Sequence, residues 1–335
     1  MYLLAPANPK EFINRALWFK SPLARKLQSQ KKVEFGFEIK GHLKEITQAP
    51  DLFWGVHLPV ALATNWYYNP ERRIKIINEV EKIAKLKPHY AVLHGISLLW
   101  KPPSKTYINR YFNISDASEH LKVLHANIKF INQLKTLVPL KIENGLVVDF
   151  YYKNDEIPFP YTYLHTGVQK VDDFLYIHKK TGVDCLLDIE HLILSLNFLN
   201  REKNYRNLPV EKIDHLSSED EKLQKIFGYY LKKNYIPYAQ PKIKLEDVVK
   251  KCQAKIFHLS GNSEDVVSGR KILSHGPIDP KNKTFRKNLR LILAQKPEIL
   301  VLETANASIP GWEFLRPNET EISFENLCQI LLEEL

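Results

Sequence analysis

Three ionisable residues interrupt one of the most apolar stretches of this chain. The stretch CLLDIEHLILSL, residues 185–196, contains Asp188, Glu190 and His191. Because the burial of an unpaired charge is costly, a partner must hold these groups if the stretch belongs to a core. Asp188 and His191 are three residues apart, so both can face one cavity where a strand turns into a helix. A carboxylate and an imidazole are both metal ligands, which suggests a cation as the partner, whereas we interpret Glu190 as structural.

Residues of the same two types also end other short apolar runs of the chain. They are His57, His94, Glu143, His258 and Glu303. A single histidine at such a place is usually a hydrogen-bonded core or surface residue, so the prediction rests on the joint pattern. Mixed imidazole and carboxylate ligands suit Zn²⁺, Mn²⁺ or Fe²⁺ better than Ca²⁺. This set is larger than one tetrahedral ion uses, which predicts two or three divalent ions.

The apolar runs alternate with segments of helical periodicity. The β-type runs cover residues 2–7, 33–39, 53–59, 90–96, 140–146, 184–190, 254–260 and 298–304, and amphipathic segments such as PERRIKIINEVEKIAKL follow most of them. Strands that alternate with helices predict a parallel sheet, and eight such units predict a closed (β/α)8 TIM barrel of the α/β class. The carboxyl-terminal strand ends of such a barrel converge on one mouth, where the ligand-type residues would meet.

The spacing of these units also predicts the domain organisation. We expect one domain over residues 1–335. The segment between the sixth and seventh strands, residues 197–253, is longer than one crossover helix needs and contains the capped amphipathic stretch SSEDEKLQKIFGYYLKKN. It is therefore expected to form a helical insertion over or beside the barrel mouth.

The composition limits the class of protein. The 335 residues carry a formal net charge of +10, which permits nucleic acid or another anion as a partner, although many lysines lie along helical segments where they would simply be solvated. The chain has no apolar run of about 18 residues, so we expect no membrane-spanning helix. The three widely spaced cysteines, Cys185, Cys252 and Cys328, predict neither a disulfide framework nor a zinc finger and favour a reducing, cytoplasmic location.

The stretches that carry the ligand-type residues resemble a known family. In order and spacing, GVHLP, VLHGISLL, KIENG, LLDIEH, IFHLSGN, SHGPID and LVLET are similar to the motifs of the xylose isomerase-like TIM barrels, and most of all to AP endonuclease family 2, the endonuclease IV branch, over roughly residues 55–305. The resemblance implies three metal sites, with Glu143 as a bridge between the first two. The implied ligands are His57, His94 and Glu143 for one ion, Glu143, Asp188, His258 and Glu303 for a second, and His191 and His275 for a third.

Three features depart from the endonuclease IV pattern. Leu273 stands where the family has an aspartate two residues before the histidine matched to His275, and this affects the third metal site. The sequence LVVDFYYK replaces the Gly-rich loop that usually follows the glutamate–asparagine pair. Val60 and Ala61 stand where endonuclease IV places side chains that penetrate DNA. The resemblance therefore supports the fold and a metal centre more strongly than an action on abasic DNA.

Aromatic and basic residues gather in the segments that follow strands three, four and five. NWYYN (65–69), WKPPSKTYINRYF (100–112) and FYYKNDEIPFPYTY (150–163) are expected as loops at the mouth. Aromatic rings stack on bases and basic side chains attract anions, but the same residues also pack long loops and line ordinary pockets. The candidates for substrate binding are Trp66, Tyr67, Tyr68, Lys101, Lys105 and Arg110.

Three functions agree with these observations. The first is a divalent-metal-dependent hydrolase, an endonuclease IV-like phosphodiesterase that acts on an anionic substrate such as abasic DNA. The second is a single-metal sugar isomerase or epimerase, because the four ligands of the implied second ion alone match those enzymes of the same superfamily. In that case Glu143 and Glu303 would transfer a proton. The third is a barrel retained as a binding or regulatory protein, which only the departures from the family pattern favour.

Overall fold

Eight parallel strands close on themselves in the order β1-β13-β10-β9-β6-β4-β3-β2. Their bounds are β1 Tyr2–Ala7, β2 Glu34–Ile39, β3 Phe53–His57, β4 Tyr90–His94, β6 Leu140–Glu143, β9 Asp184–Asp188, β10 Ile256–Leu259 and β13 Ile299–Leu302. Each strand lies within one of the runs that the sequence predicts, and barrel strands that follow one another in the chain pair as neighbours. The predicted (β/α)8 barrel is therefore confirmed.

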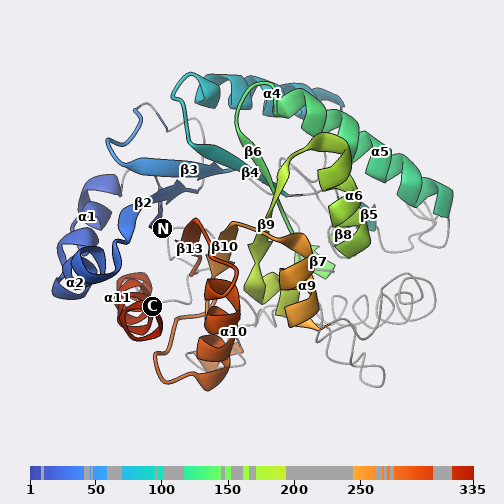
Figure 1. Cartoon of the computed structure of the whole chain (residues 1–335). Helices are drawn as coiled ribbons and strands as arrows, with labels where there is room; N and C mark the ends of the chain where they lie inside the picture. Colours follow the sequence, from blue (N-terminus) through green and yellow to red (C-terminus); the bar gives the residue numbers. More distant parts are fainter. Residues whose placement is uncertain are drawn as a thin grey trace.

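Helices lie around the outside of the barrel strands (Figure 1). The computed structural model describes residues 1–8, 11–40, 46, 48–58, 70–94, 97–100, 117–144, 148–151, 161–165, 171–193, 244–261, 266–267, 270–271, 275–304 and 319–335. Within these ranges the helices are α1 Phe12–Ala16, the 3-10 helix η1 Trp18–Lys20, α2 Pro22–Lys31, α4 Pro70–Ala84, α5 Ala117–Leu134, α6 Val171–Thr181, α9 Leu245–Cys252, α10 Lys283–Leu293 and α11 Glu319–Glu334. Side-chain caps begin two of them, Ser21 at α2 and Asn282 at α10, because each accepts a hydrogen bond from a backbone N–H in the first turn.

Side chains of the strands alternate between the barrel interior and the surrounding helices. A buried cluster fills the interior and consists of Leu4, Tyr90, Val92, Leu186, Ile256, Ile299 and Val301. Their neighbours along the strands, such as Leu3 and Leu187, belong to the larger core under the helices. Because successive strand residues point to opposite faces, a residue two positions beyond an interior residue also points inward. In β10, for example, His258 follows Ile256 at this spacing, and this alternation directs the polar strand ends into the mouth.

Two small sheets lie beyond the barrel strands. The segments β5 Ser97–Trp100, β7 Val148–Tyr151 and β8 Tyr161–His165 form an antiparallel sheet in the order β5-β8-β7, and β11 Val266–Val267 pairs with β12 Arg270–Lys271. The segments after strands four and five, expected as loops, thus contain strands. Their aromatic and β-branched residues favour extended structure, but the pairing joins segments far apart in the chain, which a local pattern does not reveal.

The structure describes only the end of the predicted insertion before β10. The predicted insertion, 197–253, ends in α9, which packs against α6 and α10 as one of the barrel helices, while residues 197–243 lie outside the described ranges. No helix in the described ranges is long and apolar enough to cross a membrane. The three cysteines are buried, free thiols. The cytoplasmic location stays a prediction.

Candidate metal centre

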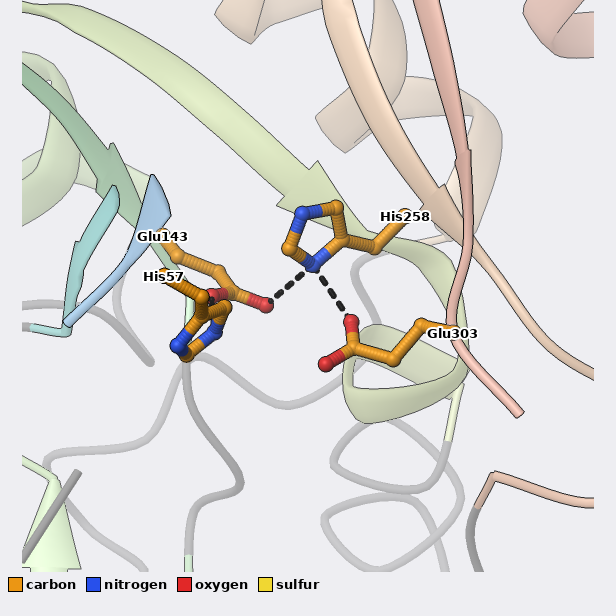
Figure 2. Close-up of side chains that lie close together, drawn as sticks. All are labelled: His57, Glu143, His258 and Glu303. Carbon is orange, nitrogen blue, oxygen red and sulfur yellow. Dashed lines mark hydrogen bonds and ion pairs between the residues drawn. The ribbon is translucent and has the colours of Figure 1, made fainter. Parts of the chain in front are cut away.

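Polar side chains from the ends of several barrel strands meet in the mouth. His57, Glu143, His258 and Glu303 point toward one another (Figure 2), and His94 lies against the first two. The first of these residues ends β3, His94 ends β4, Glu143 ends β6 and Glu303 directly follows β13. Glu303 is partly exposed, and the other four residues are buried. The inward alternation of the strands therefore brings together residues that are up to 246 positions apart.

His57, His94 and Glu143, which the resemblance implies as the first ligand group, lie in contact with one another. The distance from His57 Nε2 to Glu143 Oε2 is 3.0 Å, that from His94 Nε2 to the same oxygen is 3.1 Å, and the two Nε2 atoms are 3.2 Å apart. His57 Nδ1 lies 3.1 Å from the carbonyl oxygen of Leu58, which can only accept, so Nδ1 carries a proton and Nε2 is the atom that would face a bound ion. Tetrahedral zinc with bonds of about 2.0–2.1 Å separates its ligand atoms by about 3.3 Å, so this triangle is close to the size that a zinc ion needs.

The resemblance implies Glu143, Asp188, His258 and Glu303 as the second ligand group. In the structure, ligand atoms of His57, Glu143, His258 and Glu303 lie within 4.8 Å of one another, whereas Asp188 is grouped with His191 and His275. His258 Nδ1 lies 2.9 Å from Glu143 Oε1 and also contacts Glu303 Oε2. The two carboxylate oxygens of Glu143 are thus divided, with Oε2 in the first group and Oε1 in the second, as a bridging ligand requires. Asp188 is 1% exposed, and its Oδ2 has no hydrogen-bond partner among the described residues. A buried carboxylate oxygen of this kind fits a cation.

The pKa values of the second group show how strongly its charges interact. Burial raises the pKa of Glu143, but the nearby His94 and His258 outweigh it and hold the pKa well below its usual value. Burial lowers the pKa of His258, but the surrounding carboxylates, above all Glu303, raise it well above its usual value. For Asp188, burial and the neighbouring Glu303 and Glu143 act in the same direction and raise the pKa well above its usual value. The carboxylates therefore need positive charge among them.

Asp188, His191 and His275 form the third ligand group. His191 Nδ1 lies 3.2 Å from the carbonyl oxygen of Asn144, and His275 Nδ1 lies 3.0 Å from that of Glu303. Because carbonyl oxygens only accept, both rings carry their proton on Nδ1, and their two Nε2 lone pairs face each other at 3.2 Å. Burial lowers the pKa of His275 to about 3, so the neutral form of this ring is favoured. A metal ion fits between the two lone pairs.

The backbone at His275 is held by Glu190, which lies outside all three ligand groups. Glu190 Oε2 accepts hydrogen bonds from the Ser260 hydroxyl and from the His275 N–H, the latter at 2.6 Å. His275 has a φ of 54°, a left-handed conformation that is uncommon for histidine and needs such support. The interpretation of Glu190 as structural agrees with these contacts. Burial raises its pKa to about 8.

Three further residues reach the mouth that sequence reasoning missed. Glu38 Oε2 lies 3.0 Å from His258 Nε2 and accepts a hydrogen bond from the Tyr90 hydroxyl at 2.8 Å. Lys40 Nζ bonds Glu303 Oε1 and lies 3.5 Å from Glu38 Oε1. The signal was present in the alternation of EFGFEIK, where Glu38 and Lys40 share the inward phase of Gly36. The sequence alone does not show which of the two alternating faces of this strand points into the barrel.

The candidates for substrate binding cannot be placed relative to this centre. Trp66, Tyr67, Tyr68, Lys101, Lys105 and Arg110 all lie outside the described residues. The same holds for Val60, Ala61 and Leu273, three of the positions that depart from the endonuclease IV pattern. Their roles stay predictions from the sequence.

Comparisons with known proteins concern the fold. No protein-family model matches the sequence, and no curated protein matches it either. The structure is similar to that of a D-tagatose 3-epimerase-like protein, with 12% identity, a TM-score of 0.48, and coverage of 99% of this chain and 97% of that chain. It is similar to endonuclease IV from Thermus thermophilus, with 13% identity, a TM-score of 0.46, and coverage of 100% and 99%. A xylose isomerase-like TIM barrel protein from Mycobacterium smegmatis in complex with magnesium has 12% identity, a TM-score of 0.43, and coverage of 85% and 74%. The structural neighbours are xylose isomerase-like TIM barrels, and the function has to be argued from the residues of this chain.

Proposed function

We propose that this protein is a divalent-metal-dependent hydrolase that acts on an anionic phosphodiester. The orientation of the Glu143 carboxylate carries the proposal, because Oε2 faces His57 and His94 while Oε1 faces His258. Two cations on either side of one carboxylate would be close enough to contact a single phosphoryl group. When bound, such ions stabilise the negative charge that develops during phosphoryl transfer. Zn²⁺ or Mn²⁺ suits this mixture of imidazole and carboxylate ligands.

The charges around the first two ligand groups support a pair of ions and an anionic substrate. Among the described residues, four carboxylates lie at these groups against a single ammonium group, and the histidines are neutral when they act as ligands. These residues are Glu38, Glu143, Asp188 and Glu303 against Lys40. One divalent ion would leave the centre negative, whereas two would make it positive. A positively charged centre attracts an anionic substrate.

A sugar isomerase or epimerase is the second candidate, and the surroundings of His258 favour it. Glu143 and Glu303 both contact His258 Nδ1, so one ion in the second ligand group would have a carboxylate on either side. Two carboxylates placed in this way can transfer a proton between neighbouring carbons of a sugar. His57 and His94 would then contact the substrate instead of a metal ion.

The first experiment is a count of bound metal, joined to two assays. Protein purified without chelators is analysed for Zn, Mn and Fe, and then tested on bis(4-nitrophenyl) phosphate and on a panel of ketoses in deuterated water. Two or more ions per chain with phosphodiester hydrolysis support the hydrolase. One ion with deuterium incorporated at a sugar carbon supports the isomerase instead. A stoichiometry below one ion, with no increase after addition of Zn²⁺ or Mn²⁺, contradicts both.

Glu143→Gln is the variant that tests the bridging role. The amide keeps the size of the side chain but removes the charge that both ligand groups share, so we expect the hydrolysis rate to fall by about 100-fold or more. Because His94 and His258 favour the ionised form of Glu143, the metal-free variant is expected to melt below wild type, so activities are compared at a temperature where both proteins are folded. Glu79→Gln is the control, because Glu79 is a largely buried glutamate of α4 outside the mouth, and it should retain wild-type activity. Retained hydrolysis in Glu143→Gln would refute the role.

A further inference from the structure

Strand β2 supplies no ligand to the three groups, yet two side chains at its end contact ligands directly. We propose that Glu38 and Lys40 are positioning residues of the metal centre, which determine the atoms that His258 and Glu303 present to the ion of the second ligand group. The inference rests on the proposed metal centre and adds to it. Both residues come from one strand end, in the inward phase of β2.

Glu38 sets the orientation and the tautomer of His258. Both side chains are fully buried, and Glu38 Oε2 lies 3.0 Å from His258 Nε2. An ionised carboxylate can only accept a hydrogen bond, so Nε2 must carry the proton. Nδ1 faces Glu143 Oε1 and Glu303 Oε2, so it also carries a proton in the metal-free protein. An ion bound between these groups would replace that proton, and Nδ1 would present its lone pair while Nε2 keeps its hydrogen bond to Glu38. A carboxylate behind a metal-binding histidine fixes the ring in this way and makes it a better ligand.

Tyr90 fixes the position of Glu38 in turn. Its hydroxyl donates to the same Oε2 atom at 2.8 Å, and the ring is 1% exposed inside the barrel. Gly55 provides the space, because a Cβ atom at this position would collide with the Tyr90 ring. Four successive parts are thus joined across the barrel: the glycine of β3, the tyrosine of β4, the glutamate of β2 and the histidine of β10.

Lys40 acts in the same way on Glu303. Its ammonium group bonds Glu303 Oε1, while Oε2 of the same carboxylate faces His258 Nδ1. The lysine side chain is 18% exposed and also lies 3.5 Å from Glu38 Oε1. With Oε1 held by the lysine, only Oε2 is available to the ion, so Glu303 is restricted to a single coordinating oxygen. The lysine also offsets part of the negative charge of the centre.

The test measures metal binding and not activity. Zn²⁺ affinity is determined by competition with a chromogenic chelator, and Co²⁺ substitution reports the coordination geometry through its visible spectrum. The variants are Glu38→Gln, which keeps an acceptor, Glu38→Leu, which removes it, Tyr90→Phe and Lys40→Met. We expect one of the two ions to bind about 10–100-fold more weakly in Glu38→Leu, with a smaller loss in Glu38→Gln and Tyr90→Phe. Affinity for the ion of the first ligand group should stay within about threefold of wild type.

Lys40→Met should change the geometry more than the affinity. With Oε1 released, Glu303 can coordinate with both oxygens, which raises the coordination number and weakens the visible absorption of bound Co²⁺. Glu79→Gln again serves as the control and should bind both ions as wild type does. If Glu38→Leu fails to fold, Glu38→Gln still tests the contact with His258, because it removes the charge and keeps the size of the side chain. Tyr90→Phe tests the support of Glu38, because it removes one hydroxyl and keeps the ring.

The possible results distinguish a failure of the positioning role from a failure of the proposed metal centre. Wild-type protein that binds fewer than one ion overturns the metal centre itself. Two ions in the wild type with unchanged affinity in Glu38→Leu, or with an equal loss at both ions, overturn the role of Glu38 alone. Unchanged affinity in Tyr90→Phe overturns the role of Tyr90 in fixing Glu38. An unchanged Co²⁺ spectrum in Lys40→Met overturns the role of Lys40. Selective weakening of one ion together with the altered Co²⁺ spectrum supports the inference.

Discussion

Asp188 is a carboxylate whose two oxygens have very different surroundings. Oδ1 accepts the His191 N–H at 2.7 Å, whereas Oδ2 is buried and has no hydrogen-bond partner among the described residues. Burial, Glu303 and Glu143 together disfavour its ionised form and raise its pKa well above its usual value. Asp188 therefore weakens the metal-free protein and becomes favourable only when a cation is present.

Asp188→Asn tests whether the charge of Asp188 destabilises the metal-free protein and favours metal binding. The amide oxygen can still accept the His191 N–H, but the charge is gone. We expect the melting temperature in EDTA to be equal to that of wild type or about 2–4 °C higher, and the increase on addition of Zn²⁺ to be at most half as large. Thermal unfolding followed by circular dichroism measures both. Asp184→Asn, at the exposed start of the same strand, is the control and should keep the full response to Zn²⁺. A metal-free Asp188→Asn protein that melts well below wild type would contradict this reasoning.

At the scale of elements, a cluster of ion pairs joins the helices α10 and α11. Arg286 Nε and Arg290 Nε of α10 lie 2.9 Å and 2.6 Å from carboxylate oxygens of Glu334 in α11. Hydrogen bonds from Arg290 and Arg286 lower the pKa of Glu334 to about 2. The folded protein therefore favours the ionised form, so the stabilisation is complete above about pH 4.5 and is lost as the pH falls through about 2.

Glu334→Gln should reveal this pH dependence. We expect the free energy of unfolding to be about 0.5–1 kcal/mol lower than that of wild type at pH 7, because Arg290 is exposed and Arg286 is partly exposed to solvent, which limits the strength of the cluster. The difference should shrink between pH 4.5 and pH 3. Urea unfolding at pH 7, 4 and 3 gives these values, and Glu325→Gln on the same helix is the control. A difference that persists or grows at pH 3 is incompatible with the ion-pair explanation.

At the scale of the whole molecule, the formal net charge of +10 bears on the choice of substrate. If the phosphodiester is duplex DNA, phosphate contacts should make binding fall steeply with salt. The predicted result is Zn²⁺- or Mn²⁺-dependent incision of a duplex with a single abasic site at low salt, and weaker duplex binding at about 200 mM than at about 50 mM salt. An undamaged duplex of the same sequence is the control. If neither incision nor salt-sensitive binding occurs, DNA is excluded, and the assays on small phosphodiesters and sugars decide the function.

The local pattern of the sequence already predicts the barrel and the principal ligand types. A strand needs only a short apolar run, and the run VLH or LLD carries its own ligand-type residue at its end, so His94 and Asp188 stand out without any tertiary information. The repetition of such runs between amphipathic segments then predicts a closed parallel sheet. Those inferences depend on neighbours in the chain, which the sequence displays directly.

Other features of the centre depend on which face of each strand becomes the interior. Glu38 and Lys40 are ordinary charged residues in EFGFEIK until β2 pairs with β1 and β3 and turns their phase inward. Likewise, the sequence implies Glu143 as a ligand, but the division of its two oxygens between His57 and His258 is visible only in the folded chain. Strand pairing and barrel closure determine these contacts, because they set the phase and the register of segments that are many residues apart.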